Sequence, residues 1–275
     1  MGIAHSAIVG RAARLGKGVV VGHNCVIEDH AEIGDGCELG PNVVIFGSTK
    51  LGAGCRVHAG AVLGDAPQDT HAGDEPSFVE IGEETTIREY VTIHRASKPG
   101  GVTRVGNRCL LMAGCHVGHD AVIGDDVTLV NHVLIAGHAQ VGDRAVLGGA
   151  ALVHQFTRIG RLTMMSGGSA VQMDVPPFCM TRSTTSNTVM SLNVIGLRRA
   201  GVTSEERRAL QHAFHTLYRE GLATKQALAV LDKEQSPLVR ELVAFVRSST
   251  RGICKGIADE SATSTAEEPR LRLVG

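Results

Sequence analysis

A repeat of six residues is the feature of this chain that most limits its fold. From Ile3 an aliphatic residue recurs at every sixth position to Leu63, and the same phase returns at Ile81 and continues, with one further interruption, to Val171. A period of six matches neither the 3.6 residues of an α-helix turn nor the alternation of an ordinary strand. It predicts a solenoid in which each unit forms a short strand and a turn.

Three units of six residues make a triangular coil of 18 residues, so residue i lies under residue i+18 at about the 4.8 Å spacing of paired strands. One aliphatic side chain per unit points into a narrow core, and the frequent Gly, Asn and Asp residues form the turns. Hexapeptide repeats of this kind resemble the left-handed parallel β-helix. The left hand comes from that resemblance, because general rules favour right-handed crossovers.

Two segments leave the repeat and return in phase, so we expect them to be loops extruded from a coil, at residues 65–78 and 94–104. After Val171 the repeat ends, and a turn-rich connector is expected to about Gly201. We therefore expect a mainly β fold, with a β-helix over residues 1–185.

A second region begins where helical patterns replace the repeat. Thr203 and Glu206 form a capping-box sequence, and helical patterns follow it at about residues 224–235 and 237–248. We expect a C-terminal α-helical domain over 186–255 and a disordered, polar tail over 256–275.

Composition and charge exclude several classes of protein. The formal net charge of −1 gives no overall basic field, so nucleic acid is not an expected partner. The seven cysteines form no C-x-x-C pair, which is typical of reduced thiols in a cytoplasmic protein. No apolar run is long enough for a signal peptide or a membrane span, so we expect a soluble, cytoplasmic protein with no integral membrane segment.

The segment from Met112 to His138 concentrates ionisable side chains on the repeat: His116, His119, Asp120, His132 and His138. The 18-residue coil places Gly137 above His119 and His138 above Asp120. A glycine lets a backbone N–H approach a developing oxyanion closely, and a carboxylate can hold an imidazole in the useful tautomer. The arrangement favours general-base catalysis.

Two other interpretations of these imidazoles stay open. Four of them, His116, His119, His132 and His138, are of the right type for zinc, as in the γ-class carbonic anhydrases, although Asp120 and Gly137 would then have no evident task. A non-catalytic solenoid scaffold is the third hypothesis. No Ser or Cys has an activating partner by spacing, so the spacing favours direct general-base catalysis over a reaction through a covalent enzyme intermediate. We expect no metal and no cofactor.

Several short motifs occur in a specific order along residues 1–255. They are Gln68-Asp69, Val79–Gly82, Ile87–Glu89, Val91–Arg95, Leu110–Met112, His116-x-x-His119-Asp120, Ala136–His138, Val153–Phe156, Asp174–Pro177 and Ser249–Gly252. In these motifs the chain resembles the acyl-[acyl-carrier-protein]–UDP-N-acetylglucosamine O-acyltransferases, which begin lipid A synthesis.

The resemblance implies a homotrimer with active sites in clefts between solenoids, acyl carrier protein as the donor and a UDP-sugar as the acceptor of a 3-hydroxyacyl chain at its 3-position. It implies that His119 is the general base, supported by Asp120, with Gly137 as the oxyanion donor. The implied substrate-binding positions are His116, His138, His154, Gln155 and Asn193. Gln68 and Asp69 would reach the sugar nucleotide from a neighbouring subunit, and Gly167 would leave room for a longer acyl chain. Arg198 and Arg199 would form a basic cluster.

Three departures from the family pattern lie on the nucleotide-sugar side of the implied site. His71 stands where the family often has Lys, Ile195 stands where it often has an acidic residue, and residues 182–187 replace a shorter turn. The sequence therefore leaves open whether the acceptor is UDP-N-acetylglucosamine or a 3-amino analogue.

Overall fold

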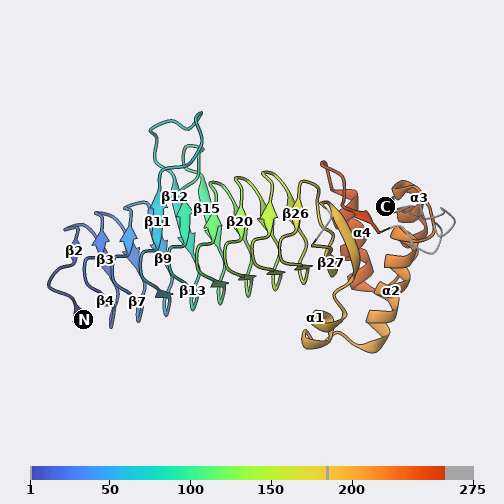
Figure 1. The fold of residues 1–275 in the computed structure, drawn as a ribbon, viewed down its shortest axis with the longest axis horizontal. Helices are drawn as coiled ribbons and strands as arrows, with labels where there is room; N and C mark the ends of the chain where they lie inside the picture. The colour runs from blue at the N-terminus through green and yellow to red at the C-terminus, as the bar shows by residue number, and fades with distance from the viewer. Residues whose placement is uncertain (1, 184–185, 258–275) are drawn as a thin grey trace, which may run out of the picture.

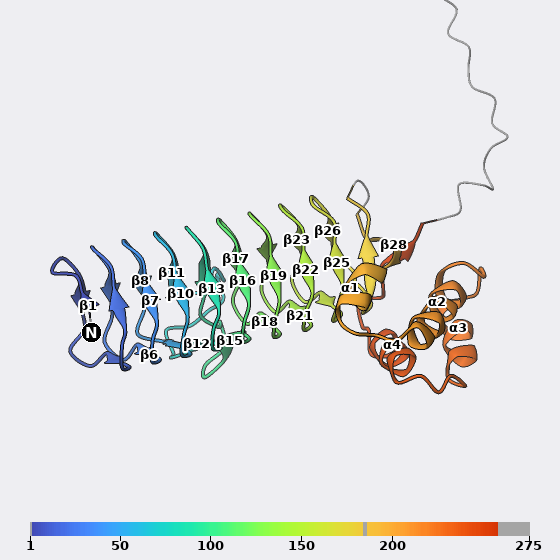
Figure 2. The ribbon, with the colours of Figure 1, turned by 90° about the horizontal axis from the view of Figure 1, so that it is seen from below.

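Each six-residue unit forms a short strand and a turn, and strands one coil apart pair in parallel. Leu111 pairs with Leu129 in one register and Leu129 with Leu147 in the next, a separation of 18 residues in both. The computed structural model describes residues 2–183 and 186–257. The strands stack into a long solenoid with helices at its C-terminal end (Figure 1, Figure 2), and the predicted left-handed parallel β-helix is confirmed.

The strands form three sheets, named A, B and C here. Sheet A holds β1 (Gly2–Ile3), β4 (Val20–Val21), β7 (Glu38–Leu39), β10 (Arg56–Val57), β13 (Thr86–Ile87), β16 (Leu110–Leu111), β19 (Thr128–Leu129), β22 (Val146–Leu147), β25 (Met164–Met165), β27 (Cys179–Thr181), β28 (Thr188–Leu192) and β29 (Lys255–Gly256). Sheet B holds β2 (Ile8–Val9), β5 (Val26–Ile27), β8 (Val44–Ile45), β11 (Val62–Asp65), β14 (Thr92–His94), β17 (His116–Val117), β20 (Leu134–Ile135), β23 (Leu152–Val153) and β26 (Ala170–Val171). Sheet C holds β3 (Arg14–Leu15), β6 (Glu32–Ile33), β9 (Thr49–Leu51), β12 (Phe78–Ile81), β15 (Val102–Val105), β18 (Val122–Ile123), β21 (Gln140–Val141) and β24 (Arg158–Ile159).

The core is a set of aliphatic columns inside the coils. Ile27, Ile45 and Leu63 are stacked in one of them and are at most 1 % exposed. Because each coil buries an aliphatic side chain from every sheet between its neighbours, burial of apolar surface accumulates along the whole solenoid.

Two excursions leave the solenoid near its middle and project from one side of it (Figure 1). They span residues 66–77, between β11 and β12, and 95–101, between β14 and β15. Both are shorter than the predicted loops, because the residues at their bases stay in strands. Phe78 pairs with Val102 beyond the length of an ordinary rung.

The C-terminal region contains four helices, α1 (Val194–Arg199), α2 (Ser204–Tyr218), α3 (Thr224–Leu231) and α4 (Pro237–Arg247), in the described part of the chain. The predicted capping box of Thr203 and Glu206 is confirmed. Helix α3 ends before the predicted residue 235, because the N–H groups of Lys233 and Glu234 bond to carbonyls three residues back in turns.

The prediction of a turn-rich connector up to Gly201 was wrong in part, since this segment contains β28 and α1. The expectation for residues 256–275 falls outside the described residues except at Gly256 and Ile257. Within the described residues, no helix is both long enough and apolar enough to cross a lipid bilayer.

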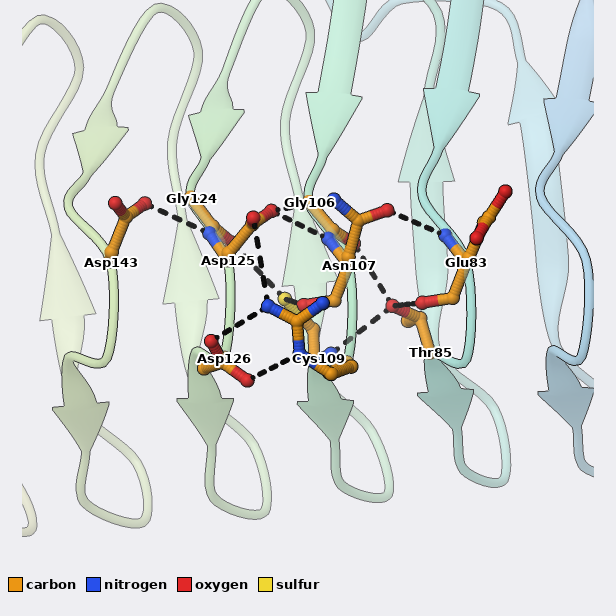
Figure 3. A network of polar contacts seen from close by, with 10 residues as sticks. Glu83, Thr85, Gly106, Asn107, Cys109, Gly124, Asp125, Asp126 and Asp143 are labelled. Atoms are coloured by element: carbon orange, nitrogen blue, oxygen red, sulfur yellow. Dashed lines mark hydrogen bonds and ion pairs between the residues drawn. The ribbon is translucent and has the colours of Figure 1, made fainter.

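Side-chain oxygens cap the backbone from one coil to the next at the corner between sheets C and A (Figure 3). Asp143 accepts the N–H of Asp125 at 2.9 Å, and Asp125 accepts the N–H of Asn107 at 2.8 Å. Asn107 in turn accepts the N–H of Glu83 at 2.9 Å. Each turn N–H in this polar ladder therefore finds an acceptor on the next coil, which stabilises the stack.

Candidate active site

The turn that follows β17 carries His119 and Asp120 at the corner between sheets B and C. Asp120 has a positive φ of 60°, and its N–H donates to Thr103 Oγ1 at 2.8 Å. The carbonyl of His119 accepts the N–H of His138, one coil above, at 2.9 Å. The two side chains are therefore presented by a turn that is fixed from both neighbouring coils.

His119 and Asp120 form a hydrogen-bonded pair in which the imidazole is oriented. His119 Nδ1 lies 2.9 Å from Asp120 Oδ2. The same oxygen accepts the N–H of Ser97 at 2.9 Å and its hydroxyl at 2.7 Å. Burial by itself would raise the pKa of Asp120, but these donors together lower it, so the group is a carboxylate. Nδ1 must then carry the proton, which leaves Nε2 as an acceptor.

Gly137 lies against the acceptor nitrogen of this pair. A Cβ placed on Gly137 would collide with His119 Nε2, so a side chain here would fill the space in front of the base. In the described part of the chain no acceptor takes the N–H of Gly137. This N–H is therefore free to donate to an oxygen that develops negative charge beside His119.

His138 lies on the other side of the Asp120 carboxylate. Its Nε2 lies 3.7 Å from Asp120 Oδ2, and its ring is stacked on Phe156 with centroids 4.5 Å apart. Burial lowers the pKa of His138.

A metal could in principle be held by His119, Asp120 and His138, the one such group found among the described residues, with ligand atoms within 4.8 Å of one another. However, Asp120 Oδ2 already accepts from His119 and twice from Ser97. These donors occupy the positions that a cation would need, so the geometry suits a catalytic pair better than a metal centre.

Two further imidazoles lie close together, His116 on the coil of His119 and His94 on the coil below it. His116 Nδ1 is 2.8 Å from Thr92 Oγ1, and its ring meets that of His94 edge to face at 5.2 Å. Burial, with His94 and His119 nearby, lowers the pKa of His116 to about 4. His116 is therefore neutral near pH 7 and can bind a polar substrate group without carrying charge.

The pocket in front of these residues has a volume of about 520 Å³. One wall is the outer face of sheet B, where Leu134 and Leu152 are 45 % and 43 % exposed. The lining residues are Gln68, His94, His116, Gly118, His119, Leu134, Ile135, Ala136, Gly137, Leu152, Val153, His154, Gln155, Ala170, Val171 and Gln172. An apolar wall beside a few convergent polar groups is typical of a site for a substrate with a hydrocarbon part.

The loop residues Gln68 and Asp69 lie beside the catalytic pair of their own chain, and the expectation that they reach a neighbouring subunit stays a prediction. Gln68 lines the pocket with His119. The N–H of His71 lowers the pKa of Asp69, with weaker contributions from His119 and Ser97. The base of the excursion is fixed to its own coil, because the carbonyl of Ala66 accepts a hydrogen bond from His94 Nδ1.

Of the other predicted positions, His154 and Gln155 line the pocket, whereas four do not enter the pocket of their own chain: Gly167, Asn193, Arg198 and Arg199. Asn193 caps α1, accepting the N–H of Gly196 at 2.9 Å and donating to the carbonyl of Leu162 at 2.9 Å. Its amide is thus occupied on both sides. Arg198 and Arg199 are exposed in the last turn of α1.

The three departures from the family pattern have different environments. His71 is 91 % exposed at its side chain and lies 3.3 Å from Asp69. Ile195 is 65 % exposed on α1. The segment 182–187 lies in part outside the described residues, and Asn187 in it accepts the N–H of Gln172 at 2.6 Å.

Sequence reasoning missed Ser97, Thr92, Thr103 and His94. Thr92 pairs with His116, 24 residues later, because the excursion between them adds residues to this coil. The regular spacing of 18 residues therefore does not predict the pair. For Ser97 the repeat gives no signal, since the residue lies inside the excursion.

Comparisons with known families agree with the fold. Residues 174–254 match the model described as "Udp N-acetylglucosamine O-acyltransferase; Domain 2". Residues 12–47, 30–65 and 103–137 match the bacterial transferase hexapeptide model.

Relatives and solved structures of similar description cover most of the chain. An acyl-[acyl-carrier-protein]–UDP-N-acetylglucosamine O-acyltransferase from Synechocystis sp. is 42 % identical over 70 % of this chain and 70 % of its own length. One from Anaeromyxobacter sp. is 40 % identical over 71 % of this chain and 77 % of its own length. A UDP-N-acetylglucosamine acyltransferase structure from Bacteroides fragilis has a TM-score of 0.88 at 36 % identity, covering 91 % of this chain and 99 % of that one.

Proposed function

Because the chain belongs to the acyl-[acyl-carrier-protein]–UDP-N-acetylglucosamine O-acyltransferase family, we propose that the pocket around His119 is the place where the acyl group is transferred. The protein is an enzyme that moves an acyl chain from acyl carrier protein to UDP-N-acetylglucosamine in lipid A biosynthesis. These relatives do not favour a zinc lyase, a scaffold or a different acceptor sugar.

The observation that carries this proposal is the orientation of His119. Asp120 holds Nδ1–H, so Nε2 accepts the proton of the acceptor hydroxyl, and we assign this hydroxyl to the 3-position of the sugar. The hydroxyl oxygen then bonds to the thioester carbonyl carbon, whose oxygen becomes negative and accepts the N–H of Gly137. When the carbon–sulfur bond breaks, the leaving sulfur takes the proton from Nε2. No covalent enzyme intermediate is needed.

Asp120 supports both halves of this cycle. A carboxylate at Nδ1 fixes the tautomer before transfer and stabilises the imidazolium that exists between the two proton transfers. The neutral His116 and the side of the pocket formed by Gln68 and Gln155 are suited to bind the hydroxyl and amide groups of a sugar, and we propose that His138, which contacts Asp120 behind this wall, assists them. The apolar wall of Leu134 and Leu152 is suited to the acyl chain, which we take to be a 3-hydroxyacyl group.

The active assembly in this proposal is a homotrimer. Sheet C carries ion pairs on its outer face, such as Arg14 with Glu32 at 2.9 Å and Arg104 with Glu80 at 3.1 Å, which suits contact with water. The strands of sheet B carry no such ion pair among the described residues, and their outer face presents exposed apolar side chains, including Ile8 at 66 % and Leu134 at 45 %. Burial of this face against another solenoid would turn the open pocket into a cleft.

The predicted residues that stay outside the pocket fit this assembly. We propose that Gly167, Arg198 and Arg199 act on the pocket of an adjacent subunit, since the two arginines are exposed cations and the substrates carry phosphate, and that Asn193 holds α1, which carries the arginines, in place. A cytoplasmic location is supported by the seven cysteines, which are all free thiols.

The test uses purified protein with 3-hydroxyacyl carrier protein and UDP-N-acetylglucosamine. We expect mass spectrometry to find the acylated sugar nucleotide, and His119→Ala to lower kcat about 10²- to 10⁴-fold. His132→Ala is the matched control, because His132 lies on the corner between sheets A and B and not in the pocket. Full activity of the His119→Ala enzyme would refute the assigned role.

A further inference from the structure

The Ser249–Gly252 segment follows α4 and is fixed to the last coil of the solenoid. Ser249 Oγ donates to Asp174 Oδ2 at 2.8 Å, and Asp174, which is 1 % exposed, also accepts from Arg158 Nε at 2.9 Å. Gly252 has a φ of +76°, and its carbonyl accepts the N–H of Asp174 at 3.0 Å. Ser249 and Gly252 thus hold the chain in place.

Arg251, between these anchors, contacts two residues that line the substrate pocket. Its Nε donates to the carbonyl of Gln172 at 3.0 Å, and its Nη2 lies 3.5 Å from His154 Nδ1. Gln172 and His154 both line the pocket. The guanidinium therefore stands at the C-terminal end of the cavity that contains His119.

The charge of Arg251 is not balanced by the protein around it. In the part of the chain that the structure describes, no carboxylate lies within ion-pair distance of this guanidinium. His154 Nδ1 also lies 3.1 Å from the carbonyl of Gln155, which can only accept, so the proton sits on Nδ1 and points to that carbonyl. Nη2 of Arg251 then has no acceptor on the imidazole. A cation with free donors, at the edge of a pocket, is suited to an anionic ligand.

We propose that Arg251 binds a phosphate group of a bound substrate at the C-terminal end of the pocket. The inference rests on the proposed function, in which both substrates carry phosphate. One source is the diphosphate of the UDP-sugar, and the other is the phosphodiester through which a carrier protein holds its acyl arm. His154 and Gln155 lie two coils above His119, a rise of about 10 Å, which places the anion away from the reacting carbonyl.

The test varies each substrate in turn with the Arg251→Gln enzyme. Glutamine keeps a donor for the Gln172 carbonyl but removes the charge. We expect the KM for one phosphate-bearing substrate to rise about ten- to hundredfold, as for the loss of a charge-assisted hydrogen bond, with a much smaller change in kcat. A rise for the UDP-sugar assigns the diphosphate, and a rise for the acyl carrier assigns the phosphodiester.

Two variants separate binding from folding. Arg251→Lys should recover part of the lost affinity, because it restores the charge without the planar fork. Arg247→Gln is the matched control, since Arg247 of α4 pairs at 2.6 Å with Asp232, which follows α3, and does not line the pocket. Its KM values should equal those of the parent enzyme.

Binding measured without turnover keeps this proposal separate from the catalytic one. Calorimetric titration with uridine 5′-diphosphate and with 4′-phosphopantetheine should show weaker binding of one of them to Arg251→Gln than to the parent protein. Equal affinity of both probes for the two proteins, or a fall in kcat with both KM values unchanged, would overturn the proposal even if acyl transfer itself is demonstrated.

Discussion

Asp120 and Asp125 lie on either side of the short strand β18, and their carboxylates have different neighbours. Asp125 accepts the N–H and the side-chain Nδ2 of Asn107, one coil below, at 2.8 and 3.0 Å (Figure 3). Asp120 accepts from His119, beside it in the sequence, and from Ser97 in an excursion. The coil supplies the same scaffold at both corners, but only the Asp120 corner pairs its carboxylate with an imidazole that lines the substrate pocket.

This difference separates a structural carboxylate from a functional one. In the polar ladder each acceptor meets a donor that the repeat itself provides, so the contact contributes to the stability of the stack. At the Asp120 corner the donors come from an insertion and from a titratable ring, and the ring nitrogen on the far side stays free. Four changes test the comparison, in order of decreasing expected effect.

Gly137→Ala should abolish most of the activity. The new methyl group would collide with His119 Nε2 and move the backbone N–H from the place of the oxyanion. The loss of one such donor typically lowers kcat about 10²- to 10³-fold. Steady-state rates, with circular dichroism to check the fold, measure the effect. Gly149→Ala is the control, because its nearest neighbour would lie 3.5 Å from the added carbon. Near-normal activity of Gly137→Ala would remove Gly137 from the mechanism.

Acidification should destabilise the active-site corner through His116. Its pKa is lowered from 6.5 to about 4 in the folded state, so between these pH values the unfolded chain binds the proton and the folded protein does not. The free energy of unfolding should therefore fall as the pH is lowered from about 6.5 to 4, by about 2–3 kcal/mol from this residue. Urea unfolding of the parent and of His116→Asn measures the difference. An identical pH dependence for the two proteins would contradict the prediction.

Ser97→Ala should lower kcat about tenfold, the effect of losing one hydrogen bond to a charged group. The hydroxyl donates to Asp120 Oδ2, and without it the carboxylate is held less firmly against His119. Ser97→Thr, which keeps the hydroxyl, should retain most of the activity. If the alanine and threonine enzymes are equally impaired, the packing of the excursion and not the hydrogen bond controls the rate.

Asp125→Ala should cost about 1 kcal/mol of stability, because it removes an acceptor from the N–H of Asn107. The rate of acyl transfer should not change, since the ladder corner does not line the pocket. Urea unfolding and the transfer assay on the same preparation measure the two quantities. A large loss of activity without a loss of stability would break the distinction between the two corners.

The fold was predictable because aliphatic residues keep the same six-residue spacing along the chain. The juxtaposition of Gly137 and His119 followed from the same spacing, since no insertion separates these two coils. Ser97 and Thr92 did not follow from it, because the excursions change the number of residues per coil. Helix α1 was missed because its only marker was Asn193, which caps it, while Gly196 lies inside it and weakens a helical pattern.

The most direct measurement of the central claim is the tautomer of His119, read from ¹⁵N chemical shifts in protein labelled at histidine. We expect a ring protonated at Nδ1, next to Asp120, with Nε2 unprotonated near neutral pH. In Asp120→Ala this preference should be lost together with most of the transfer rate. A parent enzyme that carries the proton on Nε2 would contradict the assignment of His119 as the base.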